Sequence, residues 1–398
     1  MNARLIAHYL PQFHPIPEND GWWEPGFTEW TNVTKARPLF PGHYQPRFPA
    51  DLGYYDLRVP EVRERQADLA RGAGIEAFCY WHYWFAGRRI LERPFNEVLS
   101  SGRPDFPFCL AWANESWQGV WYGCERRTLI EQTYAGQADC EAHFHTLLPA
   151  FRDKRYACVD GRPLFIIYRP ALLPDAPAFI ERWNLLAQRN GLPGIHFVAH
   201  IIFSDPFFDW RASGFNSAIL AHSLKIIRKR AWDVVTAFLR RPSHDSAGRT
   251  RNYLDAAGAV LRLAPLRILQ RILRWPGSIF DYSDACLFTM PQGPCPEGCH
   301  PTAVPNWDNS PRAGRNAVIF HRSDPEKYRA HLRQVLASVS HQPPEQRLVF
   351  LKSWNEWAEG NYLEPDRRFG HQYLSVTRDE VVCRAPRGAE SAQLQGVA

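Results

Sequence analysis

The sequence has few of the features that mark membrane-spanning or disulfide-stabilised proteins. No run of about 18 apolar residues occurs in it, which argues against a typical membrane-spanning helix. Residues 1–4 lead directly into a strand-like segment, without the apolar stretch of a signal peptide. The nine cysteines are odd in number and scattered, unlike the framework of a disulfide-rich secreted protein. We therefore predict a soluble protein of a reducing compartment, the cytoplasm.

Sequence signals for phosphate and metal binding are also absent. The chain contains no Asp-x-Asp motif of the kind that binds a metal-diphosphate complex, and no Gly-rich phosphate loop that opens a helix. Residues 295–300, CPEGCH, hold two Cys and one His, but no second ligand pair stands at a matching spacing. We expect no metal ion and no cofactor.

Aromatic residues are abundant, and positive charge is concentrated in one segment. The chain has 15 Trp, 15 Tyr and 24 Phe beside only 2 Met. We expect many of these rings to line something other than the core. The formal net charge is +6, yet residues 225–274 alone contain twelve Lys or Arg against three Asp. The rest of the chain is therefore slightly acidic.

Eight short apolar runs alternate with longer amphipathic segments, which is the pattern of βαβ units and a parallel sheet. Strands are expected at residues 5–9, 75–80, 106–112, 164–168, 196–201, 217–221, 302–306 and 348–353. Helices are expected at residues 62–71, 140–151, 176–190 and 325–339. The sequence thus predicts an α/β fold, a (β/α)8 TIM-type barrel.

Residues 223–282 fit no barrel unit and predict a basic helical insertion between strands six and seven. In this segment Arg267, Arg271 and Arg274 interleave with apolar residues at roughly helical spacing. Such a helix can hold a pyrophosphate-linked substrate, pack over the barrel wall, or touch an anionic membrane surface, which would place the protein at the periphery of the inner membrane. We predict one domain over residues 1–388, insertion included, and a flexible tail over residues 389–398. The sequence gives no indication of the oligomeric state.

Polar and aromatic clusters follow the predicted strands, where barrel enzymes place their active sites. We expect them to supply side chains that bind sugar rings and hydroxyl groups. The candidates after strands one to three are His8, Tyr9, Gln12, His14, Glu29, Trp30, Tyr80, His82, Trp84, Trp112, Asn114 and Glu115. The candidates after strands seven and eight are Trp307, Asp308, Trp354, Asn355 and Trp357. Because side chains on a strand alternate between its faces, some of these belong to the core instead, and Glu29 and Asp308 can also cap turns or helices.

The strongest functional signal lies after the last strand, at residues 353–360, SWNEWAEG. Breaking a glycosidic bond requires one carboxyl group to protonate the leaving oxygen and another to act as base or nucleophile. Glu356 and Glu359 stand three residues apart, and one ionised carboxyl raises the pKa of a close neighbour. We predict that both are catalytic. In an alternative arrangement, Glu115 is the acid and Glu356 the nucleophile.

The sequence resembles the WbsX-type proteins of bacterial surface-polysaccharide loci, which are described as glycosyltransferases and are related to glycoside hydrolase family 99. The matching stretches are HYLPQFH at residues 8–14, GFTEW at 26–30, GHYQPR at 42–47, DLGYYD at 51–56, FCYWHYWF at 78–85, WANE at 112–115, WDN at 307–309, WNEWAEG at 354–360 and LEPD at 363–366. The resemblance implies a (β/α)8 barrel and a glycan substrate. From family 99 it implies that Glu356 is the base that deprotonates the sugar 2-hydroxyl, which then attacks the anomeric carbon to give a 1,2-anhydro intermediate. Glu359 would be the acid that protonates the leaving oxygen and later activates the acceptor.

We therefore predict a carbohydrate-active enzyme that cleaves or transfers glycosidic bonds in the metabolism of bacterial surface polysaccharide, O-antigen or capsule. Its expected substrate is an oligosaccharide or polysaccharide, free or lipid-linked. The alternatives are a nucleotide-sugar-dependent glycosyltransferase of O-antigen or lipopolysaccharide biosynthesis, and a non-catalytic glycan-binding protein. Nucleic acid is not an expected partner, because the basic segment has few aromatic residues and no recognisable nucleic-acid module accompanies it.

Overall fold

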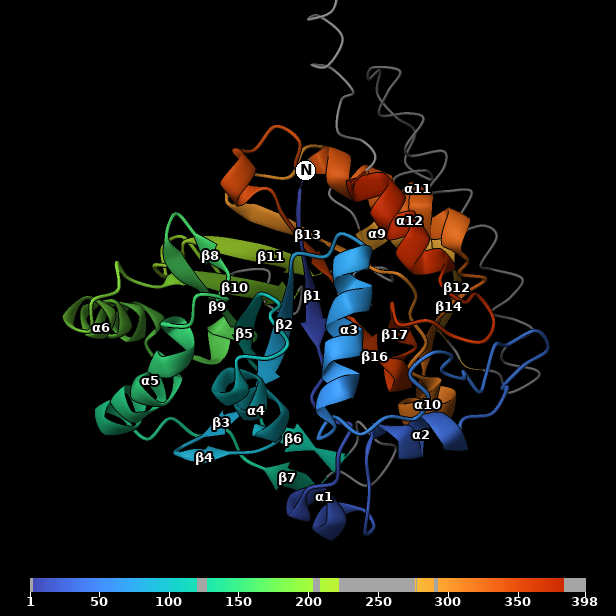
Figure 1. Ribbon diagram of the computed structural model, residues 1–398, viewed down its shortest axis with the longest axis horizontal. Coiled ribbons are helices and arrows are strands. Elements are labelled where there is room, and N and C mark those ends of the chain that lie inside the picture. Colours follow the sequence, from blue (N-terminus) through green and yellow to red (C-terminus); the bar gives the residue numbers. More distant parts are fainter. Residues whose placement is uncertain are drawn as a thin grey trace, which may run out of the picture.

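Eight parallel strands form a closed barrel at the centre of the molecule (Figure 1). The computed structural model describes residues 3–119, 127–202, 208–221, 276, 278–289 and 293–382. Each barrel strand pairs with its neighbours in the order β1, β2, β5, β9, β10, β11, β13 and β15, and β15 pairs again with β1. The bounds are β1 (Arg4–Tyr9), β2 (Ala77–His82), β5 (Phe108–Trp112), β9 (Arg162–Ile167), β10 (His196–Ile202), β11 (Ser217–Ala221), β13 (Cys299–Ala303) and β15 (Leu348–Leu351). The predicted (β/α)8 barrel is confirmed.

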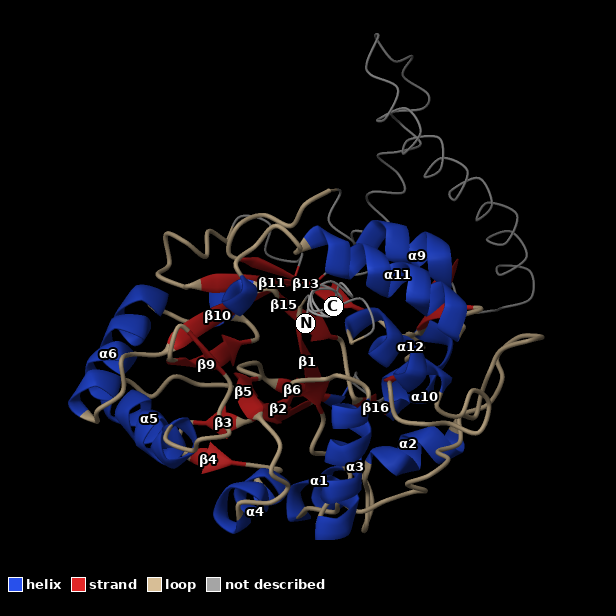
Figure 2. Ribbon diagram, turned by 45° about the horizontal axis from the view of Figure 1, so that its top comes forward, coloured by secondary structure: helices blue, strands red, loops and turns tan. Residues whose placement is uncertain are grey.

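Helices surround the strands (Figure 2). The longer ones are α3 (Pro60–Gly72), α4 (Arg93–Ser101), α5 (Gln137–Phe151), α6 (Ala176–Arg189), α9 (Tyr282–Thr289), α11 (Pro325–Ser338) and α12 (Gln372–Val381), and the shorter ones are α1 (Pro17–Trp22), α2 (Glu29–Lys35) and α10 (Ser310–Ala313). The four predicted helices correspond to α3, α5, α6 and α11. None of the helices in the described part of the chain is long and apolar enough to cross a membrane.

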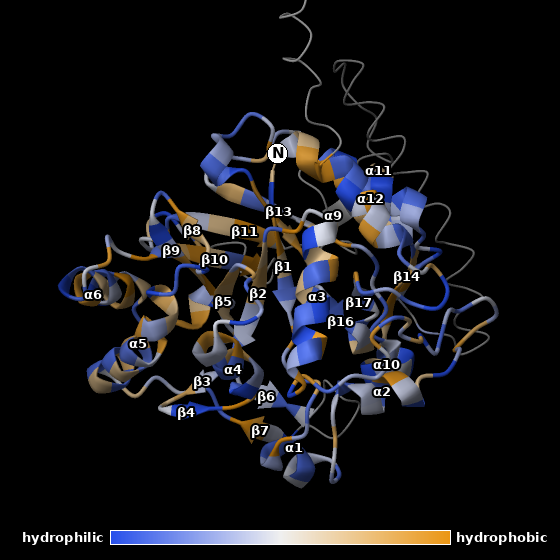
Figure 3. Cartoon of the chain, viewed as in Figure 1, coloured by the Kyte–Doolittle hydropathy of each residue, from blue (hydrophilic) through white to orange (hydrophobic). Residues whose placement is uncertain are grey.

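Burial explains why the strands read as continuous apolar runs. All four residues of β15 and all five of β5 are buried, as expected for parallel strands covered on both faces. Figure 3 shows apolar residues on these central strands and a mixture of apolar and polar residues on the surrounding helices. The helices therefore bury one stripe against the barrel and leave the other in solvent.

The seventh strand differs from the prediction. β13 covers Cys299–Ala303, whereas the sequence pattern placed this strand at residues 302–306. Cys299, His300 and Pro301 pair in register with β11, although their local composition is typical of a loop. Pairing with a neighbouring strand overrides local propensity here.

Short strands form additional small sheets around the barrel. Three antiparallel hairpins lie at the ends to which the strands point, and the sequence analysis anticipated none of them: β3 (Trp84–Phe85) with β4 (Arg88–Arg89), β6 (Trp117–Gln118) with β7 (Thr128–Ile130), and β16 (Asn355–Glu356) with β17 (Asn361–Tyr362). β8 (Cys158–Val159) adds to β9, and β12 (Ser278–Asp281) pairs in parallel with β14 (Val318–His321).

The predicted insertion and tail lie almost entirely outside the described residues. Residues 222–275 and 277 are not described, and neither are residues 383–398. Residues 278–282, at the end of the predicted insertion, form β12 and the first residue of α9. The domain bounds, the basic helix and the flexible tail stay predictions.

The start of α11 offers a test of local stability. Asp324 is its N-cap, and Asp324 Oδ1 accepts a hydrogen bond of 2.8 Å from the backbone N–H of Lys327. We expect Asp324→Ala to lower the free energy of unfolding by about 1 kcal/mol in urea denaturation at pH 7, because this cap is lost. Asp324→Asn should keep most of the stability, since the amide oxygen still caps. Equal losses in the two variants would assign the effect to the charge and contradict the capping role.

Candidate active site

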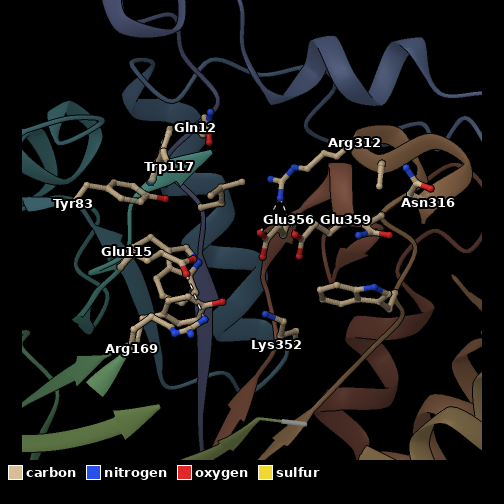
Figure 4. Close-up of a pocket in the computed structure, with 17 residues that line it drawn as sticks. Gln12, Tyr83, Glu115, Trp117, Arg169, Arg312, Asn316, Lys352, Glu356 and Glu359 are labelled. Carbon is tan, nitrogen blue, oxygen red and sulfur yellow. Dashed lines mark hydrogen bonds and ion pairs between the residues drawn. The ribbon is translucent and has the colours of Figure 1, made fainter. Parts of the chain in front are cut away.

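A cavity of about 560 Å³ opens at the carboxyl ends of the barrel strands (Figure 4). Its wall comes from the segments that follow β1, β2, β5, β9, β13 and β15. The side chains that line it combine five aromatic rings with six charged groups: Trp81, Tyr83, Trp117, Tyr168 and Trp307, with Glu115, Arg169, Arg312, Lys352, Glu356 and Glu359. Leu10, Gln12, Ala113, Asn309, Ala313 and Asn316 complete the lining. Rings beside hydrogen-bonding groups are suited to a sugar, which has both apolar faces and hydroxyl groups.

A tight turn after β15 presents Glu356 and Glu359 to this cavity. Glu356 ends β16, and Glu359 ends the short 3-10 helix Trp357–Glu359. Gly360 then adopts a left-handed conformation with φ 56°. A Cβ atom at Gly360 would lie 2.9 Å from the backbone oxygen of Asp308, so only glycine fits between the turn and the segment after β13.

The guanidinium group of Arg312 joins the two glutamates. Arg312 Nη1 lies 2.8 Å from Glu359 Oε1 and 3.5 Å from Glu356 Oε1, while Nη2 lies 2.9 Å from Glu29 Oε2. Figure 4 shows Arg312 above the pair, reaching down from α10. Two carboxyl groups of one turn and a third from the distant Glu29 thus surround one cation.

Burial raises the pKa of two carboxyl groups of the pocket. Burial, followed by the charge of Glu359, raises the pKa of Glu356 to about 7, although Lys352 and Arg312 act in the opposite direction. On the other side of the cavity, burial also raises the pKa of Glu115 to about 7, against the lowering effect of Arg169 and Lys352. Both groups therefore exchange a proton near neutral pH, where general acids and bases are most effective.

The match to known proteins covers nearly the whole chain. A family model described as "Glycosyltransferase WbsX" matches residues 5–377. The chain belongs to this WbsX family. The resemblance inferred from the sequence motifs is thereby confirmed.

Two curated relatives of this WbsX-family chain come from two strains of Xanthomonas campestris pv. campestris, and each is named "Uncharacterized protein WxcX". Both are 38% identical over 385 residues, which make up 96% of this chain and 50% of the relatives. The chain thus spans about half the length of the curated relatives it matches.

Solved structures share the fold of the WbsX-family chain at low sequence identity. A glycoside hydrolase-like protein matches with a TM-score of 0.55 and 14% identity, over 95% of this chain and 94% of the other. The glycoside hydrolase family 99 endo-alpha-mannosidase from Bacteroides thetaiotaomicron matches with a TM-score of 0.52 and 13% identity, over 96% of each chain. These structures show the fold of the chain, and the family model gives its family.

Five of the predicted site residues line the cavity: Gln12, Glu115, Trp307, Glu356 and Glu359. They are the predicted side chains that the structure brings together around one space. Their roles in catalysis and sugar binding stay predictions.

Most of the other candidates pack in the core, so the prediction that they contact the substrate does not fit their position. Trp354 and Trp357 lie beneath the glutamates at 0% and 1% exposure, and Trp357 Nε1 donates to Glu364 Oε2. Tyr9 OH donates to Gln66 Oε1 toward the helix layer. Tyr80, Trp112, Trp84, Trp30, His14 and His82 are buried likewise, and His82 Nε2 lies 2.8 Å from His143 Nε2. For the candidates on barrel strands, the cause is the alternation of faces, which leaves Trp81 rather than Tyr80 facing the cavity.

A further group of candidates holds the pocket wall in place instead of lining it. Asn114 Oδ1 accepts from the backbone N–H of Arg169, and Asn355 Oδ1 accepts from that of Leu10. His8 lies under Trp81 with its ring stacked at 4.9 Å, and Glu29 pairs with Arg312. These four candidates thus position lining residues.

Asp308, the remaining candidate, is fully buried behind the pocket. Asp308 Oδ2 accepts hydrogen bonds from His43 Nε2 at 2.8 Å and Gln45 Nε2 at 2.7 Å. Burial acts to raise the pKa of Asp308, but the hydrogen bond from His43 and the charge of Arg47 outweigh it and lower the value to about 2. Its backbone N–H donates to Glu359 O, so this charged cluster supports the turn that bears Glu356 and Glu359 from behind.

The sequence analysis missed Arg169, Arg312 and Lys352 among the charged lining residues. Arg169 directly follows the predicted fourth strand, and Lys352 lies near the carboxyl end of the predicted eighth strand, directly after β15. The rule that selected the other candidates therefore applied to them too. Arg312 comes from α10, which no pattern indicated. Among the residues the structure describes, no three His, Cys, Asp or Glu side chains are grouped as metal ligands, and Cys295 Sγ instead donates to Cys299 O.

Arg312 provides a test of the electrostatics. We expect Arg312→Met to raise the pKa of Glu356 above its value of about 7, because a charge that lowers it is removed. The change should amount to about a tenfold gain in proton affinity. Carbon NMR titration of protein labelled at the glutamate carboxyl carbons would measure it.

Two variants serve as controls for this titration. Arg315→Met removes the same charge from an exposed position three residues away and should leave the titration of Glu356 unchanged. Arg312→Lys keeps a charge and should give a smaller rise. An unchanged or lowered pKa of Glu356 in Arg312→Met would show that the guanidinium group does not control this carboxyl.

Proposed function

We propose that this chain is an enzyme that cleaves or transfers glycosidic bonds in bacterial surface polysaccharide, with Glu356 as base and Glu359 as general acid. The observation that carries the proposal is the position of both carboxyl groups on one guanidinium nitrogen, inside a cavity lined with aromatic rings. The WbsX family and the glycoside hydrolase fold support the same class of substrate.

The chemistry follows from the two environments. Glu356, with a pKa of about 7, is a stronger base than an ordinary carboxylate and is still partly ionised at neutral pH, so it is suited to remove the proton of a sugar 2-hydroxyl. The 2-oxygen then attacks the anomeric carbon, and the bond to the leaving oxygen breaks as Glu359 protonates that oxygen. Arg312 Nη1, 2.8 Å away, stabilises the carboxylate that Glu359 becomes. Water or a sugar hydroxyl, deprotonated by Glu359, then attacks the anomeric carbon. The 1,2-anhydro ring opens, and Glu356 returns its proton to the 2-oxygen.

Glu115 supports a second mechanism for the same function. Its pKa of about 7 suits a general acid, and it lies on the wall opposite Glu356 (Figure 4). In that mechanism Glu115 protonates the leaving oxygen and Glu356 is the nucleophile. The Arg169 guanidinium group, 3.5 Å from Glu115, would stabilise the resulting carboxylate.

The description of the family as glycosyltransferases supports a different reaction, transfer from a nucleotide sugar. The whole protein's reaction is itself a proposal, since the curated relatives are about twice as long. Cytoplasmic location, a lipid-linked substrate, peripheral membrane contact and subunit number stay predictions.

Product analysis distinguishes these functions. The protein is incubated with surface polysaccharide from its source, with and without nucleotide sugars. We expect shorter or rearranged chains without any nucleotide sugar. Chain growth that requires a nucleotide sugar would replace the proposal by the glycosyltransferase alternative, and binding without turnover would replace it by a glycan-binding protein.

The two glutamates can be told apart by the leaving group. Glu356→Gln and Glu359→Gln should each reduce turnover of the natural glycan by about 10²- to 10⁴-fold. With a glycosyl fluoride as donor and azide as acceptor, neither the leaving group nor the acceptor needs proton transfer. Glu359→Gln should then recover activity, while Glu356→Gln should not.

The same assay tests the alternatives. Recovery in Glu115→Gln but not in Glu359→Gln would favour Glu115 as the acid. Recovery only in Glu356→Gln would exchange the roles of the pair, and full activity of both Gln variants on the natural glycan would remove the pair from the mechanism.

A further inference from the structure

Lys352 occupies a special place in the pocket. It follows β15 directly, and its half-buried side chain reaches the cavity below Glu356 (Figure 4). Its Nζ lies 5.3 Å from the centre of the Trp307 ring. Figure 4 shows the ammonium group between the wall that bears the glutamate pair and the wall that bears Glu115 and Arg169.

The other two cations of the cavity have carboxylate partners. Arg312 contacts Glu29, Glu356 and Glu359, and Arg169 lies 3.5 Å from Glu115. In the part of the chain that the structure describes, no carboxylate oxygen lies within ion-pair distance of Lys352 Nζ. An ammonium group on the wall of a partly desolvated cavity is well suited to a negative charge supplied by a ligand.

We propose that Lys352 binds the carboxylate of an acidic sugar, so that the substrate of this site is a glycan that contains uronic acid or a similarly acidic residue. The inference rests on the proposed function, since it names the substrate class of the same site. The aromatic walls receive the sugar ring, while Lys352 beneath the glutamates receives its acidic group.

A single carboxylate fits this pocket better than a diphosphate. One ammonium group balances one negative charge. A diphosphate would bring two or more negative charges into a cavity that already holds Glu115, Glu356 and Glu359. The guanidinium groups that would offset this repulsion are already engaged with those carboxyl groups.

Direct binding tests the inference without any turnover. Isothermal titration would compare matched pairs of methyl glycosides: glucuronide with glucoside, mannuronide with mannoside, and galacturonide with galactoside. We expect at least one acidic member to bind about tenfold more tightly than its neutral partner. Lys352→Met should abolish this preference, whereas Lys352→Arg should keep most of it. Lys154→Met, which removes the same charge at an exposed site, should behave like the natural chain.

Two outcomes would overturn the inference. One is equal affinity for acidic and neutral members in every pair, or a preference that persists in Lys352→Met. The other is Lys352-dependent binding of uridine diphosphate without any preference for acidic glycosides, which would assign Lys352 to a nucleotide-sugar donor.

Turnover separates this inference from the proposed function. The polysaccharide is tested in its native form and after chemical reduction of its carboxyl groups to alcohols. Cleavage of the native form alone, with a raised KM for that form in Lys352→Met, supports both proposals. Equal cleavage of both forms would keep the function and overturn the acidic substrate.

Two further results are equally informative. Cleavage of neither form, together with Lys352-dependent binding of a uronide, would overturn the function and keep the binding site. If Lys352 served only to adjust Glu356, Lys352→Met would shift the pH profile of kcat equally on both forms. That result would overturn the inference.

Discussion

The parallel pairing of β15 with β1 closes the barrel, and the position of the candidate catalytic turn depends on it. Residues 4–7 pair in register with residues 348–351. Beyond the last pair, the backbone N–H of Trp354 donates to His8 O, and the Asn355 side chain binds both backbone groups of Leu10. The segments that leave the first and last strands are therefore fixed to each other. Glu356, the next residue along, takes its position from the closure of the barrel.

Electrostatics then limits which protonation states the site can adopt. Glu29, Glu356 and Glu359 all contact Arg312, so full ionisation would leave three negative charges around one positive charge. Protonation of one carboxyl lowers this repulsion, and the raised pKa of Glu356, about 7, makes this carboxyl partly protonated and partly ionised at neutral pH. Arg312 thus keeps the cluster together, and its charge lowers the pKa of Glu356 against the effect of burial.

The sequence predicted the barrel and the glutamate pair because both have local signals. Seven of the eight predicted strands share at least four residues with the observed ones, and the apolar runs are strong because both faces of each strand are buried. The sequence could not predict which face of a strand each side chain lies on. Tyr80 and Trp81 are both aromatic, and only their place in the barrel decides that Trp81 faces the cavity. Arg312 was missed for a different reason: it lies 44 residues before Glu356, on a four-residue helix with no periodic pattern.

The tryptophans beside the glutamates, Trp354 and Trp357, were expected to bind a sugar ring. They lie instead beneath the turn, where the ring of Trp357 stacks on that of Tyr362 with 3.7 Å between the centroids. Burial in this part of the structure desolvates Glu356.

This desolvation couples the charge of the pocket to pH. Four carboxyl groups, Glu29 included, stand against three cations, and the two with a pKa of about 7 become neutral as the pH falls below that value. The loss of these two negative charges leaves more of the positive charge of Lys352 available to a ligand. An acidic ligand would therefore bind more tightly as the pH falls through 7, whereas the base Glu356 would lose activity over the same range. Because these trends oppose each other, turnover of an acidic glycan should be highest close to neutral pH.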